Sequence, residues 1–247
     1  FYEVEISGNT NSSVRWKLNF LTNTLTFEGT GSTSSTSMSN TYNWEDYKDR
    51  ISTVVFGEGI TEISEGCFMG MNIESVSFPS TLRTINRTAF KNCVKIKEVT
   101  LPASLTNIYS DSFSGCTNLT KLTYGAGTRE VLRAYLTNVT TVVLPNSVTK
   151  IGSSAFYQCA KLQSIIIPAG VTEIGKYAFW DCSNLLSIDI PNGVTKIGEA
   201  AFNGCSNLQE LNLPASMESI DYYAFQGCKE IQKVTLPTKQ QVLTRLH

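Results

Sequence analysis

Apolar residues recur along most of this chain with a fixed spacing. A triplet of apolar positions, three and then two residues apart, stands before nearly every proline, as in Leu185, Ile188 and Ile190. The last two members alternate with polar residues, which is the period of a half-buried strand. A strand that ends directly before a proline loses no ladder hydrogen bond to it, so each triplet predicts one short strand.

The prolines define the length of the repeat. They stand on one register with steps of 23 residues, apart from one step of 43, and Gly125 occupies the missing position. Such self-similarity is typical of a solenoid, in which stacked turns bury an apolar face that one turn alone leaves exposed. We predict one solenoid of about eight turns between residues 51 and 237. The prolines are Pro79, Pro102, Pro145, Pro168, Pro191, Pro214 and Pro237.

A second apolar block follows each proline, as in GVTEIGKYAF. Its residues Val171, Ile174, Ala178 and Phe179 are expected to point inward. Gly175 follows Ile174, and many of its equivalents in other turns are Gly, Asn or Asp. These residue types predict a left-handed or tight-turn backbone at that position.

The ends of a solenoid need caps, because each end exposes a sheet edge and part of the apolar core. Residues 1–50 are predicted to form the N-terminal cap, in which Val14, Trp16 and Leu18 begin a hairpin of alternating residues. A Ser/Thr-rich loop and a short amphipathic helix at WEDYKDRI complete this cap. The solenoid then occupies residues 51–247, and the chain is a single domain overall.

Two parts of the solenoid depart from its pattern. The turn at residues 125–144 is shortened, and its segment GTREVLRAYL is predicted to be a short helix. Residues 238–247 are interpreted either as a C-terminal cap or as the start of a truncated next repeat.

Six of the seven cysteines share one column, three residues after a phenylalanine. Parallel side chains in register fit the dihedral angle of a disulfide poorly. A single column without a CxxC pair or a nearby histidine does not surround a metal ion. We therefore expect a buried column of thiols that pack as small apolar side chains. The column consists of Cys93, Cys116, Cys159, Cys182, Cys205 and Cys228.

Charge and composition narrow the possible functions. A net charge of −1 lacks the basic excess of a nucleic-acid surface, and no apolar run approaches the roughly 18 residues of a membrane span. The start FYEVEISGNT has no signal-peptide pattern. The only histidine is His247, which removes Ser–His–Asp and Cys–His nucleophile arrangements. We predict no catalytic residue, no metal ligand and no cofactor.

Two surfaces are candidate sites for a partner. The concave strand face is mostly small and polar with one apolar spot, and a merely solvated sheet is the alternative interpretation. Aromatic residues near the column phenylalanines form the second surface, for which packing against neighbouring loops is the alternative. The candidates are Val143, Ile166, Asp189 and Asn212 on the concave face, and Tyr157, Tyr177, Trp180 and Tyr223 in the aromatic loop patch.

The repeat L-x-x-I-x-I-P-x-x-V-x-x-I-G-x-x-A-F-x-x-C resembles that of the BspA-type leucine-rich repeat family of bacterial surface proteins. The copies IGSSAFYQCAKL, IGKYAFWDCSNL and IGEAAFNGCSNL carry the likeness, and SSVRWKLNFLTNTLTFEGTG resembles the family's entry hairpin. The resemblance implies a leucine-rich repeat solenoid, a right-handed α/β-type superhelix that is largely β, with short helices or turns on its convex side. Its parallel sheet would have about eight to nine strands behind an N-terminal β-hairpin cap.

The same resemblance implies a function. It predicts a non-catalytic binding or adhesion module, extracellular or on the cell surface, which binds a protein or glycan partner as a monomer. The alternative is a structural spacer, or an accessory region of a larger surface protein, with no ligand of its own.

Overall fold

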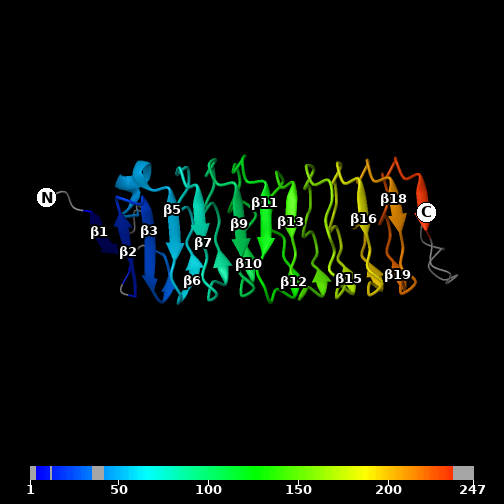
Figure 1. The fold of residues 1–247 in the computed structure, drawn as a ribbon, viewed down its shortest axis with the longest axis horizontal. Coiled ribbons are helices and arrows are strands. Elements are labelled where there is room, and N and C mark those ends of the chain that lie inside the picture. The colour runs from blue at the N-terminus through cyan, green and yellow to red at the C-terminus, as the bar shows by residue number, and fades with distance from the viewer. Residues whose placement is uncertain (1–3, 12, 35–41, 236–247) are drawn as a thin grey trace. The chain divides into compact units, whose positions relative to one another are not determined.

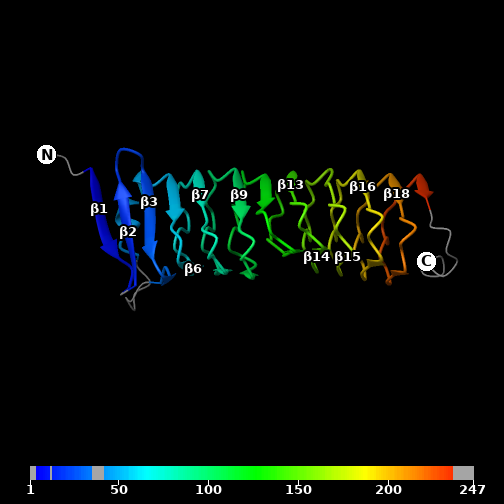
Figure 2. The same cartoon turned by 60° about the horizontal axis from the view of Figure 1, so that its bottom comes forward.

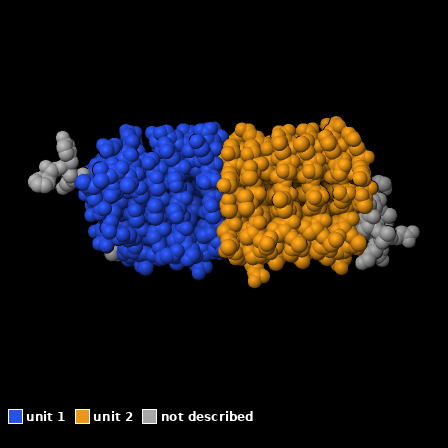
Figure 3. All heavy atoms as spheres, in the orientation of Figure 1, with its two compact units in different colours: residues 1–119 blue, residues 120–247 orange. Residues whose placement is uncertain are grey.

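The structure is a computed structural model, and it describes residues 4–11, 13–34 and 42–235. The chain divides into two compact units, residues 1–119 and 120–247, which Figure 3 shows in different colours. Both units consist of stacked turns with two short strands in each turn, and the units are described one at a time.

Unit 1 contains the N-terminal cap and three solenoid turns (Figure 1). Its elements in chain order are β1 (Glu5–Asn9), β2 (Val14–Asn19), β3 (Thr24–Gly29), β4 (Gly31–Ser32), the 3-10 helix η1 (Glu45–Arg50), β5 (Thr53–Phe56), β6 (Ile60–Ile63), β7 (Ser75–Ser77), β8 (Thr84–Ile85), β9 (Glu98–Leu101) and β10 (Asn107–Ile108). β2 pairs antiparallel with β1 and β3, and β3 pairs in parallel with β5 and so begins the stack. Figure 2 shows β1, β2 and β3 side by side at this end of the unit. The strands β4, β6, β8 and β10 form a second parallel sheet.

Unit 2 continues the repeat through the remaining turns. Its elements in chain order are β11 (Lys121–Tyr124), β12 (Glu130–Val131), β13 (Thr141–Val143), β14 (Lys150–Ile151), β15 (Glu173–Ile174), β16 (Ser187–Asp189), β17 (Lys196–Ile197), β18 (Glu210–Asn212), β19 (Ser219–Ile220) and β20 (Lys233–Thr235). On the strand face, β11 pairs with β13, and β16, β18 and β20 pair in order, all in parallel. Ile166 adds a single bridge to Asp189. The second sheet runs in the order β12, β14, β15, β17 and β19.

These elements confirm the predicted solenoid of parallel strands behind an N-terminal hairpin. The strand face contains β5, β7 and β9 in unit 1 and β11, β13, β16, β18 and β20 in unit 2. Within the described ranges the only helix is η1, which coincides with the helix predicted at WEDYKDRI. The described fold therefore contains almost no helix, and a second short strand stands where a convex-side helix was one of the expected alternatives.

The column phenylalanines form the centre of the core in both units. In unit 2 the rings of Phe156, Phe179 and Phe202 are fully buried and stacked, with centroids 5.1 and 5.0 Å apart. In unit 1 the rings of Phe68 and Phe90 stack at 5.2 Å. Each ring lies on the ring of the next turn, which explains why one turn alone has no core.

An aromatic cluster around Trp44 closes the N-terminal end of unit 1. Trp44 is 1% exposed, and its ring centroid lies 4.9 Å from that of Phe27 and 6.0 Å from that of Phe68. Its indole nitrogen donates a hydrogen bond to the carbonyl oxygen of Cys67, at 3.3 Å. Trp44, which directly precedes η1, therefore covers the first turn with a large ring, as a cap requires.

The prediction of a short helix in GTREVLRAYL is wrong. Glu130 and Val131 form β12, which pairs in parallel with β14, and residues 132–136 have no regular secondary structure. The ladder to β14 satisfies backbone groups that a helix would otherwise pair internally. The predicted C-terminal cap or truncated repeat at 238–247 lies outside the described residues.

The predicted left-handed backbone at the Gly175 column is also wrong. The positive φ values occur two residues later, at Ser154, Tyr177, Ala200 and Tyr223. Glycine is favoured at the original column because the turns approach closely there: a Cβ on Gly198 would lie 2.6 Å from the backbone nitrogen of Lys176. The residue before Gly175 belongs to β15, so the second apolar block is itself a strand.

Candidate binding surfaces

The strand face of unit 2, which was predicted to be concave, brings together three of the four residues predicted for it. Ile166 lies opposite Asp189, and Asp189 lies opposite Asn212, so the three form one row across adjacent strands. The side chain of Ile166 is 86% exposed. Val143 is 43% exposed and belongs to β13, whose described partner is β11. Ile166 is thus the apolar residue of this row, beside the polar Asp189 and Asn212.

The equivalent face of unit 1 includes the half-buried Val55 of β5 but no exposed apolar residue on β7 or β9. Its exposed positions on β7 and β9 are Ser75, Ser77, Glu98 and Thr100. The high exposure of Ile166 therefore has no counterpart on β7 or β9. Exposed apolar residues in a group are more informative than single ones, because single ones are common on ordinary surfaces.

The aromatic loop patch contains three of the four residues predicted for it. The rings of Tyr157 and Trp180 stack with centroids 6.2 Å apart, and the ring of Tyr177 meets Trp180 edge-on at 5.2 Å. All three are half-buried. Tyr223 instead contacts Tyr222, and both are exposed. The three half-buried rings pack against each other, as the alternative interpretation expects, and they also keep part of their surface open to solvent.

Charged groups surround this patch. Lys176 forms an ion pair with Glu199 at 2.8 Å, and the hydroxyl of Tyr177 donates to the same carboxylate at 3.2 Å. These bonds lower the pKa of the Glu199 carboxyl, and the hydrogen bond to Glu199 raises the pKa of Lys176. The indole nitrogen of Trp180 donates to Asp181 at 2.9 Å. The polar ends of Tyr177 and Trp180 are therefore already paired.

Sequence reasoning missed one residue of this patch, Arg133. Its guanidinium carbon lies 4.2 Å from the ring centroid of Tyr135 and 4.4 Å from that of Tyr157. Arg133 belongs to the shortened turn, where the repeat offers no equivalent position for comparison. Its only signal was the pairing of a cation with an aromatic residue in RAY, which occurs widely in loops.

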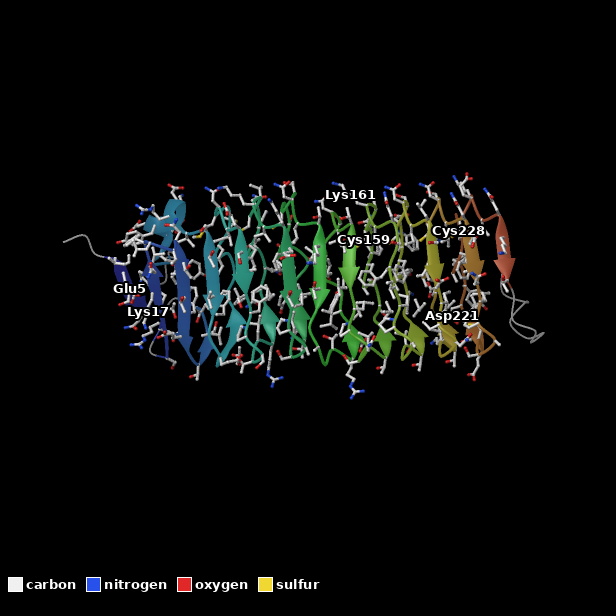
Figure 4. All side chains as sticks on the ribbon, in the orientation of Figure 1. Glu5, Lys17, Cys159, Lys161, Asp221 and Cys228 are labelled. Carbon is white, nitrogen blue, oxygen red and sulfur yellow. The ribbon has the colours of Figure 1, made fainter. Side chains whose placement is uncertain are left out.

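The cysteine column is buried, as predicted, and it also forms hydrogen bonds. The thiol of Cys182 donates to the carbonyl oxygen of Phe156 at 3.1 Å, and that of Cys205 donates to Phe179 at 3.1 Å. Each bond joins one turn to the preceding one, so the cysteine is more than an apolar plug. Figure 4 labels Cys159 and Cys228 on the same side of unit 2. All seven cysteines of the chain are free thiols.

Burial also decides the chemistry of these thiols. It raises the pKa of Cys159 and Cys228 to about 12, and it raises the pKa of Cys182 and Cys205 further. A thiol acts as a nucleophile or metal ligand only as its thiolate, and these groups remain protonated near neutral pH. The column therefore has a structural role.

Comparison with known proteins identifies the repeat. The profile described as "BspA type Leucine rich repeat region (6 copies)" matches residues 40–134 and 129–245. This chain belongs to the BspA-type leucine-rich repeat family. No curated protein matches it significantly.

Several solved structures are similar to this chain at low sequence identity. A leucine-rich repeat protein from Eubacterium ventriosum is 21% identical, over 94% of this chain and 85% of that one, with a TM-score of 0.39. The Treponema pallidum leucine-rich repeat protein TpLRR is 20% identical, over 94% and 84%, with a TM-score of 0.46. The pneumococcal vaccine antigen PcpA is 16% identical, over 97% and 90%, with a TM-score of 0.35.

Within residues 4–11, 13–34 and 42–235, no group of three or more His, Cys, Asp or Glu side chains is arranged to hold a metal ion. In the same residues no helix has the length and apolar character needed to cross a bilayer.

Proposed function

We propose that this chain is a non-catalytic binding module, extracellular or on a cell surface, that binds a protein or glycan partner along the strand face of unit 2. The observation that carries the proposal is the exposure of Ile166, whose side chain is 86% open to solvent on an otherwise polar row. Family membership supports the location, since BspA-type repeats are characteristic of bacterial surface proteins.

The energetics of Ile166 support a role in recognition. A β-branched apolar side chain contributes nothing to the core when it points outward from a sheet. Covering a side chain of this size releases roughly 1.5–3 kcal/mol. Asp189 and Asn212, which follow Ile166 in the same row, supply polar groups that orient a partner around this apolar contact. Extended partners suit such a row because neighbouring turns repeat its spacing.

The experiment is a binding screen with the purified chain on arrays of glycans and extracellular-matrix proteins. Ile166→Lys is the test variant, because it places a charge on the apolar spot. Ser77→Lys is the matched control, since Ser77 is an exposed residue at the equivalent position of unit 1. We expect specific binding that the Ile166 variant loses and the Ser77 variant retains.

The competing function is a spacer that carries another domain and has no ligand of its own. Failure of the wild-type chain to bind any component of the arrays would favour that role and count against the proposal. Binding that both variants retain would also contradict it, because the strand face of unit 2 would then have no part in recognition.

A further inference from the structure

The geometry around Arg133 points to a second binding site, on the turns of unit 2. Its guanidinium group lies between two aromatic rings, 4.2 Å from the centroid of Tyr135 and 4.4 Å from that of Tyr157. Each ring contacts the cation through its π system. Arg133 as a whole is half-buried, so part of its side chain remains open to a ligand.

One donor of this guanidinium group has no acceptor among the described residues. The Nε of Arg133 is buried and has no hydrogen-bond partner. Among the residues that the structure describes, no carboxylate lies within ion-pair distance of Arg133, whereas Lys176 has one such partner and Lys150 has two. A partly desolvated charged donor without a partner costs free energy. The arrangement is therefore suited to an acceptor that comes from outside the chain.

The geometry of the guanidinium group indicates which kind of acceptor fits it. Guanidinium donors form a planar fork that matches the two oxygens of a carboxylate. The two tyrosine rings already restrict the orientation of the side chain, so little rotamer freedom remains to be lost on binding. Lysine at this position would keep the charge and lose both the fork and the stacking.

The neighbouring rings indicate the kind of molecule that carries the carboxylate. Tyr157 stacks on Trp180, and Trp180 contacts Tyr177. The guanidinium group of Arg133 therefore lies beside a half-buried aromatic surface. Arginine, tyrosine and tryptophan are the residue types that dominate binding energy at protein interfaces. We propose that Arg133 binds an aspartate or glutamate side chain of an acidic protein segment whose apolar residues cover Tyr157 and Trp180. The site lies apart from the strand-face row, so either proposal survives the failure of the other.

The test is a selection of random linear peptides, with blocked termini, on the intact chain. We expect the selected peptides to contain Asp or Glu next to an apolar residue. Affinities of the chosen peptides are then measured for Arg133→Gln and Arg133→Lys. Loss of a hydrogen-bonded charge pair predicts about 10- to 100-fold weaker binding for Arg133→Gln. Arg133→Lys should recover little of it, and raising the salt concentration should weaken wild-type binding.

Arg129→Gln is the matched control, because Arg129 is an exposed arginine of the same turn and the change in net charge is equal. Its affinity should stay within about twofold of the wild type. Thermal unfolding of every variant checks that the fold is retained, and Arg133→Lys keeps the charge at this position if Arg133→Gln does not fold. Selection of peptides without acidic residues, or equal affinity for both wild type and Arg133→Gln, would overturn the proposal. Binding of acidic glycans in place of every peptide would overturn its choice of partner.

Discussion

The ring stack of unit 2 predicts a measurable coupling between successive turns. Phe179 is 0% exposed, and its ring lies 5.1 Å from that of Phe156 and 5.0 Å from that of Phe202. Phe179→Leu keeps an apolar side chain in the core and removes both ring contacts. Phe225 is half-buried and has one described ring neighbour, Phe202, at 5.3 Å. Phe225→Leu therefore serves as the comparison.

The magnitudes follow from the number of ring contacts. An aromatic pair contributes about 0.5–1.5 kcal/mol beyond the area that it buries. Loss of two pairs should cost Phe179→Leu about 1–3 kcal/mol from this source, and loss of one pair should cost Phe225→Leu about half as much. Repacking of the smaller leucine adds at most about 1.5 kcal/mol, and it adds less at the half-buried site.

The assay is equilibrium unfolding in urea, followed by circular dichroism, for the two single variants and for a double-mutant cycle. The cycle combines Phe179→Leu with Phe202→Leu and isolates the contact between these two rings. We expect a coupling energy of about 0.5–1.5 kcal/mol. A value below about 0.3 kcal/mol, as for independent sites, would refute the reasoning that ring stacking joins the turns.

Three further predictions address the close approach of turns, the thiols and the surface ion pair. Gly198→Ala places a Cβ 2.6 Å from the backbone nitrogen of Lys176. We therefore expect thermal unfolding to show a free energy of unfolding lower by more than about 1 kcal/mol. Unchanged stability would show that the turns separate easily. Burial raises the pKa of the Cys182 thiol. Iodoacetamide at pH 8 should therefore leave Cys182 unmodified in the native chain and modify it in denaturant, which mass spectrometry can follow. Rapid labelling of the native chain would contradict the burial of this thiol. The pKa of Glu199 is lowered in the folded chain, chiefly by its hydrogen bond from Lys176, so the carboxylate adds stability above its unfolded pKa and loses it as the pH falls. The difference in Tm between wild type and Glu199→Gln should therefore be present at pH 7 and vanish below about pH 4, and a difference independent of pH would count against the ion pair.

Much of the fold follows from spacing alone. A period of 23 residues with apolar triplets before each proline predicts the strand face, and alternation from Val14 to Leu18 predicts the capping hairpin. The burial of the cysteine column was predictable as well, because its position relative to the column phenylalanine is constant. These features depend on the periodicity of residue types, which can be seen in the sequence itself.

The backbone conformations were harder to predict, because contacts between turns override residue preference. Ser154, Tyr177 and Ala200 adopt positive φ values although none is glycine or asparagine. The backbone nitrogen of Tyr177 donates a hydrogen bond to the carbonyl oxygen of Glu199 at 3.0 Å. The backbone nitrogen of Ser154 donates one to the carbonyl oxygen of Lys176 at 2.8 Å. A hydrogen bond to the next turn stabilises each residue in a conformation that it would avoid in isolation.

The candidate sites were predicted only in part, for a related reason. The exposure of Ile166 follows from its place between two buried strand positions, so the sequence was sufficient there. The clamp around Arg133 depends on the path of a shortened turn without secondary structure, and no other turn repeats that path. The spacing of the repeat therefore could not predict that the rings of Tyr135 and Tyr157 both contact the guanidinium group of Arg133.

The affinity of the wild-type chain for its strongest array partner, compared with that of Ile166→Lys, tests the binding-module proposal most directly. Burial of one isoleucine side chain is worth roughly 1.5–3 kcal/mol, so we predict binding that is about 10- to 100-fold weaker in this variant. The control Ser77→Lys should bind within about twofold of the wild type. Equal affinity of all three proteins would contradict the claim that the strand face of unit 2 recognises the partner.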